Sequence, residues 1–212
     1  HGYDDPAPGL QVLWITPLRA LTRDIQAAMQ ESMAFYDLPW KAAIRTGDTP
    51  ASEKQRMKKN PPFCLITTPE SLHLLLSHRN SRAYFRNLRA VIVDEWHELL
   101  STKRGVQVEL ALSRLKNMVK RPPLRIWGIS ATIANLDQAA RVLSGLPDPV
   151  IIRADIRPDI EVTSILPDEV EKFPWAGYLG IKLLDKVMPV IQKSRSTLLF
   201  TNTRSQTEIW YQ

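Results

Sequence analysis

Two adjacent carboxylates directly follow a run of aliphatic residues, and a histidine lies two positions further on. The segment reads Ala90-Val91-Ile92-Val93-Asp94-Glu95-Trp96-His97. Such a run is typical of a strand buried on both faces of a sheet, and ligands of open α/β sheets bind beyond the carboxyl ends of the strands. Asp94 is therefore predicted to hold Mg²⁺, and Glu95 to orient a water molecule for attack on a nucleotide γ-phosphate. Taken alone, the pair also fits a surface acid pair at a strand end.

Hydroxyl residues stand at three further junctions between an apolar run and a following polar segment. At Thr16-Pro17 and Thr68-Pro69 the threonine is predicted to cap a helix, and proline suits the first helical position. Helix starts expose backbone N–H groups that suit phosphates, although caps also begin helices that bind nothing. The third junction is Ser130-Ala131-Thr132. Around Asp94, the three junctions predict a phosphate-facing edge of the sheet.

In this order the segments resemble the motifs of superfamily 2 helicases, and in particular the Lhr-like group that includes ligase-associated DEXH-box enzymes. The resemblance covers nearly the whole chain. It matches residues 17–21 to motif Ia, 45–49 to the next nucleic-acid loop, 67–72 to motif Ib, 94–97 to motif II, 130–132 to motif III and 197–204 to motif IV. The tryptophan in the motif II variant, together with residues 173–180, points to the Lhr-like branch.

The resemblance implies the motor core of an ATP-dependent DNA helicase, with ATP and Mg²⁺ as cofactors. Asp94 and Glu95 would hold the metal and activate water, while His97, Ser130 and Thr132 would relay the ATP state to the nucleic-acid face. Single-stranded DNA is the expected partner, and DNA-repair partners follow from the resemblance only. The residues expected to contact nucleic acid are Thr16, Pro17, Arg19, Thr46, Gly47, Thr68, Pro69, Thr201 and Arg204.

One expected motif is absent from the sequence. The chain contains no G-x-x-x-x-G-K-[ST] phosphate loop and not even a Gly-Lys pair. We therefore interpret it as an internal piece of a helicase, without the first strand and without motifs V and VI, and expect it to be inactive as an ATPase by itself. The alternatives are a nucleic-acid-binding module that does not hydrolyse ATP, an RNA-directed DEXH-box helicase, and a metal-dependent nuclease built on Asp94, Glu95 and His97, which would need further carboxylates.

Composition indicates a globular cytoplasmic protein. The 212 residues are 44% hydrophobic, with no apolar run near the ~18 residues of a membrane span and no signal peptide. The single Cys64 is expected to be buried, and the four histidines lack zinc-ligand spacing. A net charge of +6 favours nucleic acid as a partner. The basic residues Arg79, Arg82, Arg86 and Arg89 have helix-like spacing and are interpreted individually as a solvated helix face.

Alternating apolar runs and breakers predict an α/β protein, a RecA-like parallel sheet with helices on both faces, followed by the beginning of a second RecA-like domain. The expected boundaries are 1–154 for the first domain, 155–168 for a linker and 169–212 for the second domain. Strands are expected at 11–15, 41–45, 63–67, 90–94, 124–130 and 150–153, and helices at 17–36, 51–58, 69–76, 106–119 and 136–143. In the second domain we expect a helix at 175–193 and a strand at 196–201. Trp14 and Trp127 are expected in the core.

Overall fold

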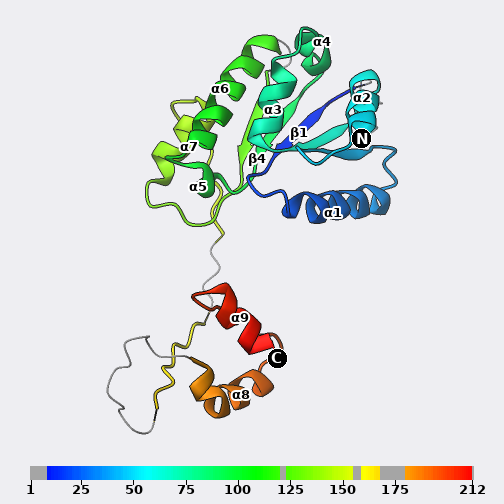
Figure 1. Ribbon diagram of the computed structural model, residues 1–212. Helices are drawn as coiled ribbons and strands as arrows, with labels where there is room; N and C mark the ends of the chain where they lie inside the picture. The colour runs from blue at the N-terminus through cyan, green and yellow to red at the C-terminus, as the bar shows by residue number, and fades with distance from the viewer. Residues whose placement is uncertain (1–8, 120–122, 155–158, 168–179, 212) are drawn as a thin grey trace. The chain divides into compact units, whose positions relative to one another are not determined.

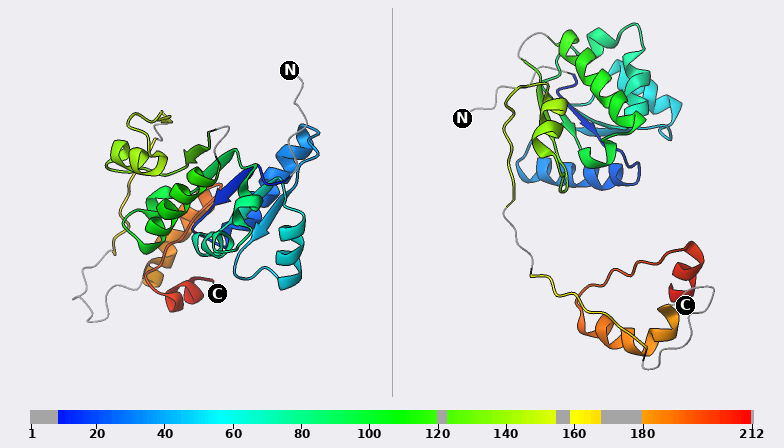
Figure 2. Two further views of the ribbon diagram at one scale, coloured as in Figure 1. Left: turned by 90° about the horizontal axis from the view of Figure 1, so that it is seen from above. Right: turned by 90° about the vertical axis from the view of Figure 1, so that its left-hand side faces the viewer.

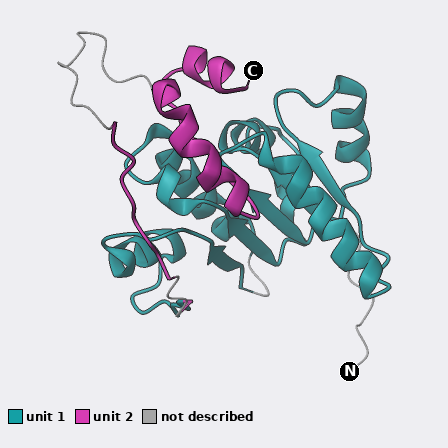
Figure 3. Cartoon of the chain, turned by 90° about the horizontal axis from the view of Figure 1, so that it is seen from below, with its two compact units in different colours: residues 1–153 teal, residues 154–212 magenta. Residues whose placement is uncertain are grey.

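The computed structural model describes residues 9–119, 123–154, 159–167 and 180–211. The chain divides into two compact units, His1–Arg153 and Ala154–Gln212 (Figure 3). Each unit is described below by itself. No helix among the described residues is both long and apolar enough to cross a membrane.

The first unit is built on one five-stranded sheet in which all paired strands are parallel. The strand order is β2-β3-β1-β4-β5, so β1 lies between β3 and β4. The strands are β1 Val12–Ile15, β2 Ala42–Arg45, β3 Cys64–Thr67, β4 Ala90–Val93 and β5 Arg125–Gly128. Because the register aligns their last residues, all five strands end at one edge of the sheet.

Seven helices connect and follow these strands in the described part of the first unit. They are α1 Leu21–Phe35, α2 Ala51–Lys59, α3 Pro69–Leu76, α4 Ser81–Phe85, α5 Trp96–Leu99, α6 Lys103–Met118 and α7 Leu136–Ser144. Figures 1 and 2 show α1 on one side of the sheet and α3 and α6 on the other.

Strand alternation divides the apolar residues between these two layers. In β1, Leu13 and Ile15 join the larger core under α2 to α7, whereas Val12 and Trp14 pack with α1. Cys64 lies in the α1 layer and is 2% exposed, and burial raises the pKa of its thiol to about 12. The predictions of a parallel sheet with helices on both faces and of a buried Cys64 are therefore confirmed.

Some predicted boundaries are wrong. The first helix begins at Leu21 rather than Pro17, because residues 17–20 form a turn in which the Leu21 N–H donates to the Leu18 carbonyl. The short helices α4 and α5 were not predicted, since four or five residues are too few to show a helical period. No strand forms at 150–153, where Val150 and Ile152 are more than 90% exposed and no neighbouring strand pairs with them.

Trp127 is not a core residue, although it was predicted to be one. It pairs in register with Ile92, which itself pairs with Trp14, so all three side chains belong to the face that α1 covers. The apolar residues of α1 pack with β1, β2 and β3. Trp127, on the edge strand β5, lies beyond the strands that α1 covers and is 62% exposed. Trp14 is half-buried, as expected for the middle of the sheet.

The second unit contains three helical segments in its described residues. They are the 3₁₀ helix Gly180–Leu183, α8 Leu184–Lys193 and α9 Arg204–Tyr211. These segments account for the predicted helix from residue 180 onward, and residues 175–179 lie outside the described residues. The predicted strand at 196–201 does not form, and Leu198 and Phe200 are more than 80% exposed there. A strand needs a hydrogen-bonded neighbour, and no described segment of this unit provides one.

Gly105 is required where α6 begins beside α5. The Thr102 side chain caps α6 by accepting a hydrogen bond from the Gly105 N–H at 3.1 Å, and a Cβ on Gly105 would collide with the Leu99 carbonyl oxygen. Alanine is favoured over glycine within helices by about 1 kcal/mol, whereas overpacking costs about 1–3 kcal/mol. Against a backbone carbonyl we expect the collision to dominate.

We predict that Gly105→Ala lowers the free energy of unfolding by about 2 kcal/mol, measured by urea denaturation. Ser113→Ala, on the exposed face of the same helix, is the matched control and should change stability by less than about 0.5 kcal/mol. A Gly105→Ala protein as stable as the wild type would mean that α5 can shift away from α6 without cost.

Candidate nucleotide and nucleic-acid site

The segment that carries Asp94 is held between two strand ends by backbone hydrogen bonds. The Asp94 N–H donates to the Ile15 carbonyl at 2.8 Å, which continues the pairing of β1 with β4. On the other side, the Trp96 N–H donates to the Ile129 carbonyl at 3.0 Å, beyond the end of β5. The carboxylates that follow β4 therefore have a backbone fixed on both sides.

Trp96 anchors this segment to the core. Its side chain is 2% exposed, and the indole Nε1 donates to the Ala139 carbonyl in α7 at 3.2 Å. A buried indole with a satisfied N–H contributes apolar contact area and a fixed orientation. Trp96 is thus a structural residue that joins α5 to α7.

Asp94 and Glu95 are presented differently at this edge. Asp94 is 9% exposed, and its carboxylate accepts hydrogen bonds from the Glu95 N–H at 3.1 Å and from Trp14 Nε1 at 3.4 Å. Glu95 has φ 47° and ψ 47°, the left-handed conformation, which costs a residue with a Cβ about 1–2 kcal/mol. The turn directs the Glu95 side chain away from the strand, leaving it partly exposed beside His97.

His97 links this turn to the loop after β5. Its Nδ1 lies 3.1 Å from the Ser130 hydroxyl and accepts the Ala131 N–H at 3.2 Å. A Glu95 carboxylate oxygen also lies 3.4 Å from Nδ1. Nε2 lies 3.4 Å from a Glu98 carboxylate oxygen. The structure therefore brings together the predicted residues His97 and Ser130, while Thr132 is exposed three residues beyond Ile129.

A second cluster joins the turn before α1 to the loop after β2. The Arg19 guanidinium donates to both oxygens of Asp48, at 3.1 and 3.3 Å, and a Cβ on Gly47 would lie 3.3 Å from its Nη2. Arg19 and Gly47 are both exposed. The two segments that were predicted to contact nucleic acid thus meet at one place, with Asp48 orienting the arginine.

The predicted threonines and prolines lie beneath this surface. Thr16, Pro17, Thr68 and Pro69 are buried, and so is Thr46, whose N–H donates to the Thr49 hydroxyl at 2.9 Å. Thr68 is the N-cap residue of α3, with Pro69 at the helix start, as predicted. Thr16 is not an N-cap, since that position belongs to Ala20. The Thr16 hydroxyl is buried without a hydrogen-bond partner among the described residues.

Sequence reasoning missed Arg104, which connects the turn before α1 to the first turn of α3. From the first turn of α6 it donates to the Pro17 carbonyl at 2.8 Å and to the Glu70 carboxylate at 2.6 Å. Burial raises the pKa of Glu70, but hydrogen bonds from its own N–H, from Arg104 and from Thr68, with the charge of Arg104, outweigh burial and lower it. No sequence signal marks Arg104, because its partners are 87 and 34 residues away.

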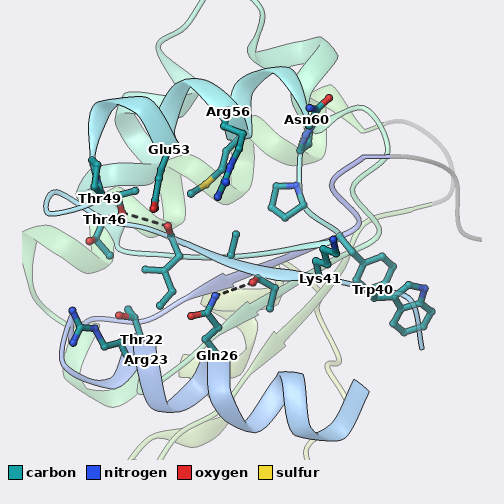
Figure 4. Close-up of a pocket in the computed structure, with 18 of the residues that line it drawn as sticks. Thr22, Arg23, Gln26, Trp40, Lys41, Thr46, Thr49, Glu53, Arg56 and Asn60 are labelled. Atoms are coloured by element: carbon teal, nitrogen blue, oxygen red, sulfur yellow. Dashed lines mark hydrogen bonds between the residues drawn. The ribbon is translucent and has the colours of Figure 1, made fainter. Parts of the chain in front are cut away.

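A groove of about 1400 Å³ runs from this cluster along the open edge of β2. Figure 4 shows α1 on one side, with Arg23 and Gln26, and Glu53 and Arg56 of α2 on the other. Gln26 donates to the Ala42 carbonyl at 2.8 Å and so satisfies an edge group of β2. The charged lining includes Arg19, Arg23, Lys41 and Arg56 against Asp48 and Glu53, so the groove is basic overall.

The two predicted contact residues of the second unit lie near the start of α9. The Thr201 hydroxyl lies 2.6 Å from the Thr207 hydroxyl. Arg204 is almost fully exposed, and its Nε lies 3.4 Å from Glu208 one helical turn later.

Comparisons with known proteins agree with these motifs. The family model described as DEAD/DEAH box helicase matches residues 3–139. The ATP-dependent helicase Lhr-Core protein 2 of Thermococcus barophilus is 37% identical, over 94% of this chain and 25% of that protein. ATP-dependent helicase Lhr-Core of Methanothermobacter thermautotrophicus is 38% identical, over 92% of this chain and 24% of that protein.

Solved structures show the same fold. The Mycobacterium smegmatis helicase Lhr bound to ssDNA and AMP-PNP is 32% identical, with a TM-score of 0.73 over 95% of this chain and 27% of that one. Helicase MrfA bound to DNA and AMPPNP, at 21% identity and a TM-score of 0.72, covers 94% of this chain and 28% of its own, and supports the fold alone.

The chain belongs to the DEAD/DEAH box helicase family, and its relatives confirm the resemblance to the Lhr-like branch of superfamily 2. Its five-stranded parallel sheet is RecA-like, as predicted. The chain spans about a quarter of the length of the curated relatives it matches.

We predict that Arg104 and Glu70 are coupled in stability in a pH-dependent way. A double-mutant cycle of Arg104→Gln and Glu70→Gln, followed by urea denaturation at pH 7, should give a coupling of about 0.5–1 kcal/mol, since both side chains are more than a third exposed. The folded-state pKa of Glu70 is lowered, so the coupling is present above its unfolded pKa of about 4.3. It should be lost as pH falls through the folded-state value.

The cycle for Arg114→Gln and Glu109→Gln, two exposed residues of α6, serves as the control. A coupling between Arg104 and Glu70 that stays constant from pH 7 to acid would mean that packing, not charge, joins them.

Proposed function

We propose that this chain is the part of an ATP-dependent DNA helicase motor that holds the hydrolytic carboxylates and one wall of the nucleic-acid track. The carrying observation is that Asp94 and Glu95 follow β4 on a fixed turn, with His97 of that turn bonded to Ser130 beyond β5. Two motifs more than 30 residues apart are thereby connected at the edge where α/β sheets bind ligands.

The donor set at this edge fits a magnesium ion held with nucleotide phosphates. Mg²⁺ takes carboxylate oxygens, usually from one or two side chains, and neutralises phosphate charge when bound. Asp94 is nearly buried and fixed by its two hydrogen bonds, so its carboxylate would hold the ion. Glu95, more exposed and offset by the left-handed turn, would orient and activate the attacking water. His97, with Ser130 and Thr132, would report the nucleotide state to the adjoining loop.

The nucleic-acid contacts belong to the same edge. Arg19 and Gly47 supply exposed groups for phosphates, above the buried Thr16, Pro17, Thr46, Thr68 and Pro69 that shape the loops. Thr201 and Arg204 of the second unit are proposed to contact phosphates as well. Phosphate contacts carry little sequence information, which suits a motor that moves along any sequence.

DNA is the proposed substrate because the Lhr relative of known structure was solved with ssDNA and AMP-PNP. A cytoplasmic location, which rests on the composition, and a role in DNA repair, which rests on the resemblance to ligase-associated enzymes, belong to the same proposal. The alternative, an RNA-directed DEXH-box helicase, belongs to the same family and would use the same site. A nuclease lacks support, since no group of three metal-binding side chains occurs within the described residues.

The proposed organisation places a first RecA-like domain at residues 1–154, a linker at 155–168 and the beginning of a second domain at 169–212. The division of contacts between Arg153 and Ala154 supports this boundary. The exposed edge strand β5, with Trp127, supports pairing with a further strand. Because the sequence contains no phosphate-loop motif, we propose that such a strand also brings the phosphate loop, without which the chain would not turn over ATP.

The division of labour between the two carboxylates is testable in a longer protein that carries the phosphate loop. Glu95→Gln preserves shape but removes the basic oxygen, so hydrolysis should fall about a hundredfold or more while nucleotide affinity changes by less than about threefold. Asp94→Asn should weaken Mg²⁺-dependent nucleotide binding itself. Equilibrium binding of a fluorescent ATP analogue and steady-state turnover measure the two effects.

Glu109→Gln, on the exposed side of α6, is the control and should leave both quantities near wild type. Equal loss of nucleotide binding in Asp94→Asn and Glu95→Gln would contradict the assigned roles.

A further inference from the structure

The opposite edge of the sheet, where the strands begin, carries a concentration of positive charge. From Lys58 to Val93 the sequence has six lysines and arginines and one acid, Glu70, and that acid is paired with Arg104. Five of the cations are exposed near the end of α2, around α4 and before β4: Lys59, Arg79, Arg82, Arg86 and Arg89. Figure 1 shows α4 and α5 at opposite ends of the sheet, so this charge lies far from Asp94.

The arginines here do not form one solvated helix face, as their spacing had suggested. Helix α4 spans only Ser81–Phe85, so Arg82 alone of the four is helical. Arg79 precedes the helix. Arg89 lies just before β4, and its own N–H donates to the Gln11 carbonyl. Four cations at one sheet edge repel one another unless an anion is nearby, and no ion pair holds them within the described part of the chain.

A cavity of about 520 Å³ opens within this basic edge. The end of α2 contributes Lys58 and Lys59, and the segment from α3 to α4 contributes His78, Arg79, Ser81 and Tyr84. Leu75, Pro61 and Ala83 supply apolar lining, and no carboxylate lines it. The lining therefore offers cationic and hydroxyl donors around a partly apolar floor.

Tyr84 of α4 supplies part of the cavity wall. Its hydroxyl oxygen is buried and has no hydrogen-bond partner among the described residues. Burial raises the pKa of Tyr84 to about 12, and the nearby charge of Arg45 opposes this. The hydroxyl therefore stays protonated at neutral pH and adds no negative charge to the basic edge.

We propose that this cavity and its basic rim form a second phosphate-binding site, which holds the backbone of the nucleic acid beyond the segment at the Arg19 edge. A polymer with regularly repeated charge suits cations spread over α2, α4 and the start of β4 better than a single small anion does. Nucleic acid as the polyanion rests on the proposed function. Guanidinium and hydroxyl donors recognise phosphate oxygens without reading bases.

The test is the salt dependence of DNA binding by the 212-residue chain, measured by fluorescence anisotropy with a short and a long single strand. The short strand has about 10 nucleotides, enough for one site, and the long one can reach both edges. Lys59→Gln/Arg79→Gln should lower the slope of log affinity against log salt by about 1.4 on the long strand. It should leave binding of the short strand within about twofold.

Tyr84→Phe is the second variant, and it leaves all charges in place. Without DNA it should unfold at the same or a higher temperature, because it removes an unsatisfied buried hydroxyl. With the long strand its affinity should stay within about twofold of wild type, because the hydroxyl oxygen has no accessible surface through which to reach a phosphate. A slope that falls in Lys59→Gln/Arg79→Gln but not in Tyr84→Phe therefore reports the loss of charge.

Two further variants separate the possible outcomes. Arg114→Gln/Arg141→Gln removes two exposed charges from α6 and α7 and should be close to wild type. Arg19→Ala tests the proposed function, since it should lower the slope for both strands by about 0.7. If Arg19→Ala has this effect while Lys59→Gln/Arg79→Gln matches the control, the second site is refuted and the proposed function stands.

Two results would show that the ligand is not the nucleic-acid backbone. Saturable binding of AMP that depends on Lys59 and Arg79, without any effect of these residues on the long strand, would identify a small-molecule phosphate site and overturn the proposal. Binding of a poly-glutamate peptide that survives competition by excess DNA would identify an acidic protein segment and would also overturn it.

Discussion

The parallel register of β1, β4 and β5 is the constraint on which the rest of this structure depends. Strands that run the same way and end together place every following loop at one edge. Asp94, Arg19 and Ser130 come from loops that are more than 30 residues apart in sequence, and the register alone brings them to that edge. Its last hydrogen bonds, from the amides of Asp94 and Ile129, extend the ladder beyond the strands into the site.

The parallel register also separates two edges of the sheet that differ in charge. At the carboxyl edge, two cations are paired with nearby acids, Arg19 with Asp48 and Arg104 with Glu70. At the opposite edge, Lys59, Arg79 and their neighbours have no such counter-charge among the described residues. The carboxyl edge also holds the left-handed Glu95 and the unpartnered Thr16 hydroxyl. Local strain of this kind is maintained because the surrounding core, including Trp96, fixes the backbone.

Sequence predicted the sheet well because its signals are local. Aliphatic runs, Thr-Pro junctions and the order of short motifs are visible without the fold. They located the five strands of the first unit and marked His97 and Ser130, which the fold brings into contact. It failed where an outcome depends on distant partners. Arg104 binds groups 87 and 34 residues away, and Trp127 is exposed because α1 covers other strands. The strands expected at 150–153 and 196–201 lack a neighbour, which periodicity cannot reveal.

We predict that the hydrogen bond between His97 and Ser130 couples ATP hydrolysis to strand movement, and the most direct test is the ATP consumed per base pair unwound. A longer protein with the phosphate loop and the Ser130→Ala change should keep DNA-stimulated hydrolysis within about threefold of wild type. Its unwinding should fall about tenfold, the upper value of one net hydrogen bond. If hydrolysis and unwinding fall in equal proportion, or if neither changes, the connection between the two loops does not carry the signal and the central claim is contradicted.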